Sequence, residues 1–332
     1  MVTQKRVSLF WPVVLIGTGA ILLLRNLGYL PEFNWSVLLK LWPLVLVVIG
    51  LDLLFGHRAP WVGGLIGLLT VAAAIAFLYY SPALGISTPE GIKTEVVSSP
   101  LEDTTSVEYY LDTSYPPVTI SALPGSTDLV KATIVHRGQV NFDVKGEADK
   151  IVSLSATTEP DAWLSFDLGL GGQKWDIGLT PRVPTTINLN GGSGSLDLDL
   201  AGITLEALRA DLGSGASKMA LPQSKQPYEV DIESGSGSVN LVLAEGTDVT
   251  LELNSASGAV SVSIPSTSGV RIEVMDDGSG SLQIPNSFIA GAGNADNGEM
   301  GTWQSVNFDS AANTITIRVS DRGSGSIHFK IR

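Results

Sequence analysis

A cluster of glycine and serine residues recurs through the C-terminal half of the sequence at nearly constant spacing. Successive clusters are separated by 21, 22, 21 and 22 residues, and the last follows after 45 residues. A flexible linker has no reason to recur at fixed intervals, so this spacing indicates an internal structural repeat. The central glycines of the clusters are Gly194, Gly215, Gly237, Gly258, Gly280 and Gly325.

The residues that flank each cluster alternate between apolar and polar types. Val230 and Ile232 precede the cluster at Gly237, and Val239 and Leu241 follow it. Alternation with a period of two is typical of strands that bury one face. Each unit is therefore predicted to contain a strand, a Ser-Gly corner, a second strand and a variable polar corner. Stacked units can bury a continuous apolar seam that no single unit could bury alone.

The glycines are expected to be structural corners rather than ligand-binding residues. Glycine reaches positive φ without steric cost, and serine hydroxyls can satisfy backbone groups that a turn leaves unpaired. Small residues also allow corners to stack at the strand spacing of about 4.8 Å. A β-branched residue at Gly237 should destabilise the stack by about 1–3 kcal/mol or more if this glycine has positive φ.

The repeat alone is compatible with a coil of parallel strands and with a meander of hairpins. The corners are four or five residues long and lack the Asn-Gly or Asp-Gly pairs of tight hairpins, which favours a solenoid-like stack. Regular repeats cover about 187–332, with one enlarged unit near Asn286 to Gln304. Less regular strands are predicted from 105 to 186, with Trp163, Phe166 and Trp175 in their core. The external all-β domain is thus assigned to 105–332 and a Pro/Gly/Ser-rich tether to 81–104.

Residues 1–80 form a predicted membrane region with three transmembrane helices. The segments Val7 to Leu24, Trp35 to Phe55 and Trp61 to Tyr80 each have about the 20 residues needed to cross a bilayer. A cleaved signal peptide is the alternative for the first segment, but a small-residue cleavage site is missing after it. Aromatic residues near the ends of the segments are expected at the membrane interface. They are Trp11, Trp35, Trp42, Trp61, Tyr79 and Tyr80.

Basic residues predict the orientation of these helices. Lys5 and Arg6 precede the first segment and Arg58 lies between the second and third, which places both regions in the cytoplasm. Arg25 in the opposite loop weakens this bias. Three spans then place everything after Ser81 outside the cell, whereas a re-entrant third segment would reverse the side. The predicted location is the bacterial plasma membrane, with a cytoplasmic N-terminus and an extracytoplasmic β domain.

The charge and composition exclude several classes of function. The chain has 33 acidic and 20 basic residues, and 31 of the acidic residues follow residue 85, so the β domain should repel nucleic acid. The absence of cysteine removes disulfides and thiol chemistry. His57, His136 and His328 are far apart, and Asp197 lies three residues after Gly194 rather than two as in calcium-binding nonapeptides. We therefore predict no catalytic residue, no metal site, no cofactor and no enzyme activity.

Two segments resemble a known group of bacterial proteins. The membrane region contains FWPVVLIGTGAILLL from Phe10 and a second copy, LWPLVLVVIGLDLLF, from Leu41. This duplication resembles the membrane region of LiaI/LiaF-type cell-envelope stress proteins. The segment WDIGLTPRVPTTINLNGGSGSLDLDLAGITLEALRADLGSG from Trp175 resembles the toast-rack β domain of LiaF-like proteins and adhesin-type proteins.

The resemblance implies a stacked β domain on a membrane anchor that senses or regulates envelope stress through protein–protein contacts. Its implied partners are the lipid bilayer and a membrane histidine kinase or another envelope protein, and a homo-oligomer is a further possibility. A surface adhesin or architectural β-solenoid module, in which the helices serve only as an anchor, is the alternative function.

Overall fold

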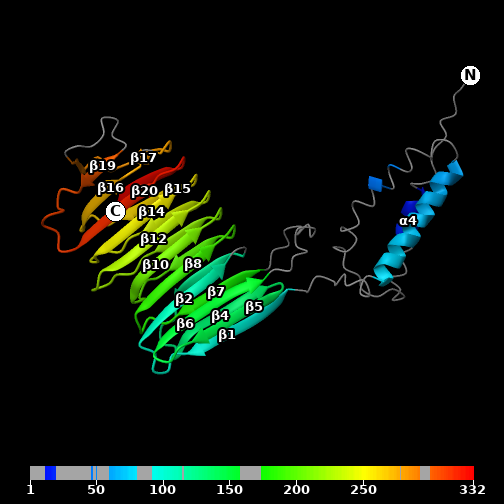
Figure 1. Cartoon of the computed structure of the whole chain (residues 1–332), viewed down its shortest axis with the longest axis horizontal. Coiled ribbons are helices and arrows are strands. Elements are labelled where there is room, and N and C mark those ends of the chain that lie inside the picture. Colours follow the sequence, from blue (N-terminus) through cyan, green and yellow to red (C-terminus); the bar gives the residue numbers. More distant parts are fainter. Residues whose placement is uncertain are drawn as a thin grey trace, which may run out of the picture. The chain divides into compact units, whose positions relative to one another are not determined.

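The computed structural model describes residues 12–19, 46–47, 50, 60–80, 92–113, 116–157, 173–276, 278–291 and 300–332. The chain divides into two compact units. The first consists of Met1–Gly91 and Thr158–Gly171, and the second of Ile92–Thr157 and Gly172–Arg332. Figure 1 shows that the second unit is a long stack of strands.

The described part of the first unit is helical. Residues 12–19 form helix, and α4 (Pro60–Tyr80) extends over 21 residues, in agreement with the predicted helical segment Trp61 to Tyr80. Within the described residues, no helix meets the combined requirements of length and hydropathy for a membrane span. The predicted spans Val7 to Leu24 and Trp35 to Phe55 lie mostly outside the described residues, so the three-span arrangement stays a prediction.

The second unit contains two sheets, and their spatial order differs from the order of the strands along the chain. The first sheet contains, in spatial order, β1 (Lys93–Pro100), β4 (Asp128–His136), β7 (Lys174–Leu179), β3 (Val118–Ala122), β9 (Leu196–Asp199), β11 (Ser217–Ala220), β13 (Ser238–Val242), β15 (Ala259–Ile264), β21 (Ser326–Ile331) and β17 (Leu282–Gln283). The second contains β18 (Ile289–Ala290), β19 (Gly301–Gln304), β16 (Gly269–Val274), β20 (Thr314–Asp321), β14 (Val249–Ser255), β12 (Tyr228–Ser234), β10 (Leu205–Leu212), β8 (Thr185–Gly191), β2 (Ser106–Thr113), β6 (Asp149–Thr157) and β5 (Gln139–Lys145).

From β8 to β15 the chain alternates between the two sheets, and each Ser-Gly corner leads from the second sheet to the first. Strands β8, β10, β12 and β14 pair in parallel, as do β9, β11, β13 and β15. The structure is therefore a coil of parallel strands rather than a meander of hairpins. We call each pair of strands joined by such a corner a rung.

The alternating residues of the two sheets meet in one continuous core. Leu241 of β13 and Ile232 of β12 are fully buried, as are Leu198 of β9 and Leu251 of β14. Trp175 is 1% exposed, as predicted for a core residue, whereas Trp163 and Phe166 lie outside the described residues. Because each rung buries its inward face only against its neighbours and the opposite strand, apolar burial couples the rungs into one stack.

The last rung of the chain does not occupy the last place in the stack. Strand β20 lies between β14 and β16, and β21 lies between β15 and β17, all in parallel. The sequence spacing predicts the spatial order Gly258, Gly280, Gly325, but the structure places Gly325 between the other two. A similar insertion occurs near the other end, where β2 and β3 lie between the β6–β7 and β8–β9 pairs.

Antiparallel strands close both sheets at one end of the stack and the second sheet at the other, whereas the first sheet ends there in the parallel strand β17. At one end β4 pairs antiparallel with β7 and β1, while β5 pairs antiparallel with β6. At the other end β19 pairs antiparallel with β16 and β18. These strands pair with the parallel strands β6, β7 and β16, whose outer backbone groups would otherwise be unpaired.

Strand β1 corrects the predicted extent of the tether. Residues 81–104 were expected to form a linker, but Lys93–Pro100 pairs along its length with β4. The sequence analysis did not predict this strand because most of its side chains are exposed and it lacks regular apolar alternation. Such a polar, Pro-terminated strand is typical of a sheet edge.

Candidate functional site

The structure brings all six predicted corner glycines into one line along the stack. At five of the six corners a Cβ on the glycine would overlap the carbonyl oxygen of the equivalent glycine one rung away. The distances from this Cβ to that oxygen are 1.8 Å for Gly215 and Gly194, 1.9 Å for Gly237 and Gly215, 1.9 Å for Gly258 and Gly237, 2.0 Å for Gly325 and Gly258, and 1.6 Å for Gly280 and Gly325.

Of the two expected reasons for glycine at these corners, the structure supports close stacking and not positive φ. The glycines with positive φ are elsewhere, and none of the six is among them. Glycine is required because a side chain would collide with the backbone of the adjacent rung, not because the backbone is left-handed. Backbone hydrogen bonds such as Gly237 N–H to Gly213 O, at 3.3 Å, hold successive corners at this close spacing.

The predicted membrane-interface residues are only partly described. Trp61 is the second residue of α4 and its side chain is 67% exposed, while Tyr79 and Tyr80 end the same helix. Trp11, Trp35 and Trp42 lie outside the described residues. The position of these aromatic residues at a membrane interface therefore stays a prediction.

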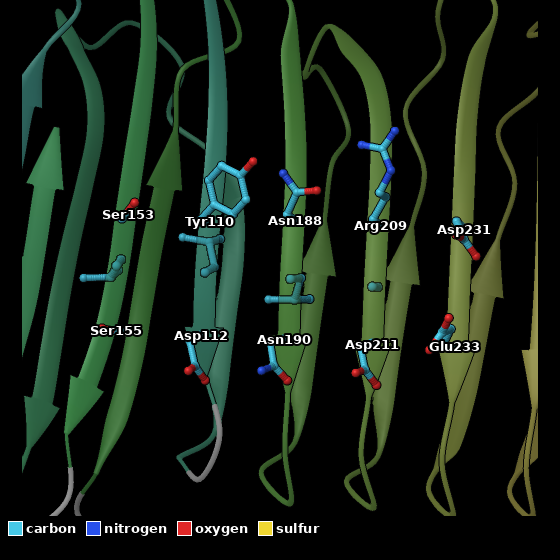
Figure 2. A pocket seen from close by; sticks show the side chains of 14 residues that line it. Tyr110, Asp112, Ser153, Ser155, Asn188, Asn190, Arg209, Asp211, Asp231 and Glu233 are labelled. Atoms are coloured by element: carbon cyan, nitrogen blue, oxygen red, sulfur yellow. The ribbon is translucent and has the colours of Figure 1, made fainter. Parts of the chain in front are cut away.

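A groove on the outer face of the second sheet is the candidate site for a ligand or partner. It has a volume of about 470 Å³ and crosses the five adjacent strands β6, β2, β8, β10 and β12. This volume lies within the range of about 300–1,000 Å³ that is typical of binding pockets. Figure 2 shows the polar side chains that border it.

Strand register arranges these side chains in two rows, one on each side of the groove. The pairing of β6, β2, β8, β10 and β12 places Ser153, Tyr110, Asn188, Arg209 and Asp231 side by side, which we call the upper row. The residues two positions further along these strands are Ser155, Asp112, Asn190, Asp211 and Glu233, which we call the lower row. Because i and i+2 share a sheet face, both rows point outward.

The upper row combines an aromatic ring, an arginine and a half-buried carboxylate. Tyr110 is 46% exposed, and the neighbouring Glu108 raises the pKa of its hydroxyl through a hydrogen bond and its negative charge. Burial and the charge of Glu252 raise the pKa of Asp231, although Arg209 opposes this shift. The Oδ1 atom of Asp231 is buried without a hydrogen-bond partner among the described residues.

The lower row is acidic and lacks a basic residue. Asp211 of β10 and Glu233 of β12 are register partners, so two like charges lie on adjacent strands. Within the described part of the chain, neither carboxylate forms an ion pair. Like charges at such positions are destabilising unless they are neutralised. The groove is therefore suited to a positively charged or hydrogen-bond-donating ligand.

Sequence reasoning did not identify the groove, although the repeat contains a signal for its residues on β8, β10 and β12. Asn190, Asp211, Glu233 and Asn254 each lie four residues before a corner glycine. Alignment of the repeats would have placed these polar residues in one row. Tyr110 and Ser153 could not be found in this way, because they belong to the irregular strands before the repeats.

Comparison with protein families finds two matches. Residues 88–242 match the family described as the N-terminal domain of toast_rack, and residues 9–54 match the LiaI-LiaF-like transmembrane region. The first match ends with β13 and includes every residue that lines the groove. A comparison with curated proteins finds no match.

Comparison with solved structures finds matches of low sequence identity. A "putative cell adhesion protein" from Clostridium sporogenes is 19% identical with a TM-score of 0.49, over 73% of this chain and 100% of that chain. A "putative adhesin" from Bacteroides fragilis is 14% identical with a TM-score of 0.30, over 73% of this chain and 98% of that chain. The two family matches carry the comparison: residues 9–54 are similar to the LiaI-LiaF-like transmembrane region, and residues 88–242 are similar to the N-terminal domain of toast_rack.

Proposed function

We propose that this chain is a bacterial plasma-membrane protein that regulates the response to cell-envelope stress through protein–protein contacts and without catalysis. The observation that carries the proposal is the presence of a LiaI-LiaF-like transmembrane region and a toast-rack domain in one chain. The membrane region anchors the protein. When the β domain binds a ligand or partner, the membrane helices signal this binding to another protein in the same membrane, such as a histidine kinase.

In this proposal three helices cross the membrane and the β domain lies outside the cell. The hydropathy of the first 80 residues and the positions of Lys5, Arg6 and Arg58 support this arrangement. The rigid stack suits a binding module, because side chains on paired strands are held at fixed separations. The groove on its second sheet offers such a surface.

Deletion of residues 92–332 tests the proposed function. The truncated and full-length proteins are expressed from the native locus, and transcription of envelope-stress genes is measured with and without a cell-wall-active antibiotic. We expect the deletion to change this transcription. Unchanged transcription together with lost surface attachment would instead support an adhesin.

Cysteine labelling tests the topology, because the natural sequence contains no cysteine and therefore gives no background. A Ser236→Cys variant should react with a membrane-impermeant maleimide added to intact cells, whereas Thr3→Cys should react only after lysis. Protection at position 236 with labelling at position 3 would reverse the orientation.

A further inference from the structure

We propose that the groove on the second sheet binds an extended, positively charged segment of a partner polypeptide. This inference deepens the proposed function, on which it rests for the role of the β domain as a partner-binding module. It names both the contact surface and the chemistry of the partner. The shape, the charge and the aromatic side chain of the groove each support it.

The shape of the groove fits an extended chain. Five adjacent strands contribute to it, and strands in a sheet are about 4.8 Å apart, so it extends across about 19 Å of the sheet. The two rows of side chains are separated by two residues along each strand, which is about 7 Å. A peptide in extended conformation rises about 3.3 Å per residue, so about six residues fit along the groove.

The charge of the groove favours a basic ligand. Its border carries four carboxylates, at Asp112, Asp211, Asp231 and Glu233, against the single guanidinium of Arg209. The carboxylates of the lower row lie on β2, β10 and β12, so successive side chains of a bound peptide could each approach one. Complementary charge of this kind gives specificity and accelerates association.

The aromatic ring of Tyr110 adds a contact that suits lysine or arginine. The side chain is 46% exposed and stands in the upper row opposite Asp112, on the same strand. A cation over the face of an exposed tyrosine is attracted by the negative face of the ring. The flexible apolar stem of a lysine or arginine can also pack against the ring.

Other ligands of positive charge fit the groove less well. Among the described residues, no group of acidic or histidine side chains is close enough together to hold a metal ion. The carboxylates are instead spread over successive strands, and an asparagine separates Asp112 from Asp211 in the lower row. This spacing matches charges distributed along a polymer better than one compact ion.

A binding experiment on the full-length protein in lipid nanodiscs tests the proposal. The probe is fluorescein-labelled hexalysine, with a neutral Gly-Ser hexapeptide and hexaglutamate for comparison, and binding is followed by fluorescence anisotropy. Nanodiscs of zwitterionic lipid are used because they attract the charged probe little. Empty nanodiscs measure the binding of the probe to the lipid itself. We expect hexalysine to bind, the other two peptides not to bind, and higher salt to weaken the binding.

Charge variants locate the binding. The D211N/E233Q variant should weaken hexalysine binding about tenfold, which corresponds to about 1.4 kcal/mol. The matched control, D197N/D199N, removes the same charge from the outward positions of β9 in the other sheet and should change the affinity less than about twofold. R209Q removes the only basic residue of the groove and should strengthen the binding. Circular dichroism verifies that each variant is folded.

Three results would overturn the proposal: no preference for hexalysine over the neutral peptide, equal losses in the two charge variants, or weaker binding by R209Q. None of them would affect the transcription result for the deletion of residues 92–332. Failure of the groove proposal is therefore distinguishable from failure of the proposed function.

Discussion

A single methyl group at Gly237 should destabilise the whole stack. In the G237A variant the new Cβ would lie 1.9 Å from the carbonyl oxygen of Gly215, whereas ordinary contacts of this kind begin at 3.4 Å. The two corners must therefore separate by about 1.5 Å, which is the difference between these distances. The obstacle is backbone, so rotation of a side chain cannot relieve it.

The structure sets the size of the effect. The hydrogen bond from Gly237 N–H to Gly213 O is already 3.3 Å long and that from Ala259 N–H to Gly237 O is 3.2 Å, so a shift of this size breaks at least one of them. A lost hydrogen bond costs about 1 kcal/mol. Overpacking adds about 1–3 kcal/mol. We expect a total near 3 kcal/mol, or a decrease in Tm of about 6–12 °C for a domain of this size.

Thermal unfolding of the full-length protein in detergent, followed by circular dichroism in the β region, measures this effect. Gly191→Ala is the matched control, because its Cβ would lie 3.4 Å from the nearest atom, the Leu212 Cδ2, and Gly191 does not have positive φ. We expect the control to change the stability by less than about 1 kcal/mol. Equal Tm values for G237A and G191A would refute the view that close backbone stacking requires glycine at the corner.

Three further predictions concern the core, the groove and the C-terminal rung. Leu241→Ala should destabilise the domain by about 2–5 kcal/mol, because this side chain is fully buried, and chemical unfolding measures the loss. The pKa of Asp231 is raised in the folded state, so its charge lowers stability at neutral pH and this penalty is gone below the ordinary value of 3.8. Asp231→Asn should therefore raise Tm at pH 7 but not below pH 3.8; a constant difference at all pH values would contradict the assigned cause. Truncation after Asn313 removes β20 and β21 and should make β16 and β17 sensitive to protease, whereas protection equal to that of the full chain would disprove their dependence on the inserted rung.

Much of the β architecture can be predicted from the sequence because each rung contacts mainly its neighbours. The alternation around Gly237 predicts two strands, and the constant spacing of the glycines predicts their stacking. Val230 pairs with Leu251, which lies one repeat of 21 residues later in the sequence. The length of the repeat therefore predicts which residues of adjacent strands pair. Local sequence patterns are sufficient to predict the strand order where consecutive repeats in the sequence are also adjacent in the structure.

The same patterns fail where distant segments meet. Nothing in the alternation of Ile317 shows that its strand lies between those of Leu251 and Ile272, because all three strands have the same pattern. The groove depends on such pairing as well: Tyr110 lies beside Asn188 only because β2 joins the stack next to β8. Of the two reasons inferred for glycine at the corners, close stacking agrees with the structure, whereas positive φ is wrong because the sequence of one repeat does not reveal its backbone angles.

The insertion of β20 and β21 also affects when the domain can mature. The two strands follow β14, β15, β16 and β17 in the sequence, yet their places lie between these strands, which are synthesised earlier. Until β20 and β21 have been synthesised, β14 and β16 have no strand between them, and β15 and β17 likewise lack theirs. This end of the β domain therefore cannot reach its native strand order while only the preceding strands have left the ribosome.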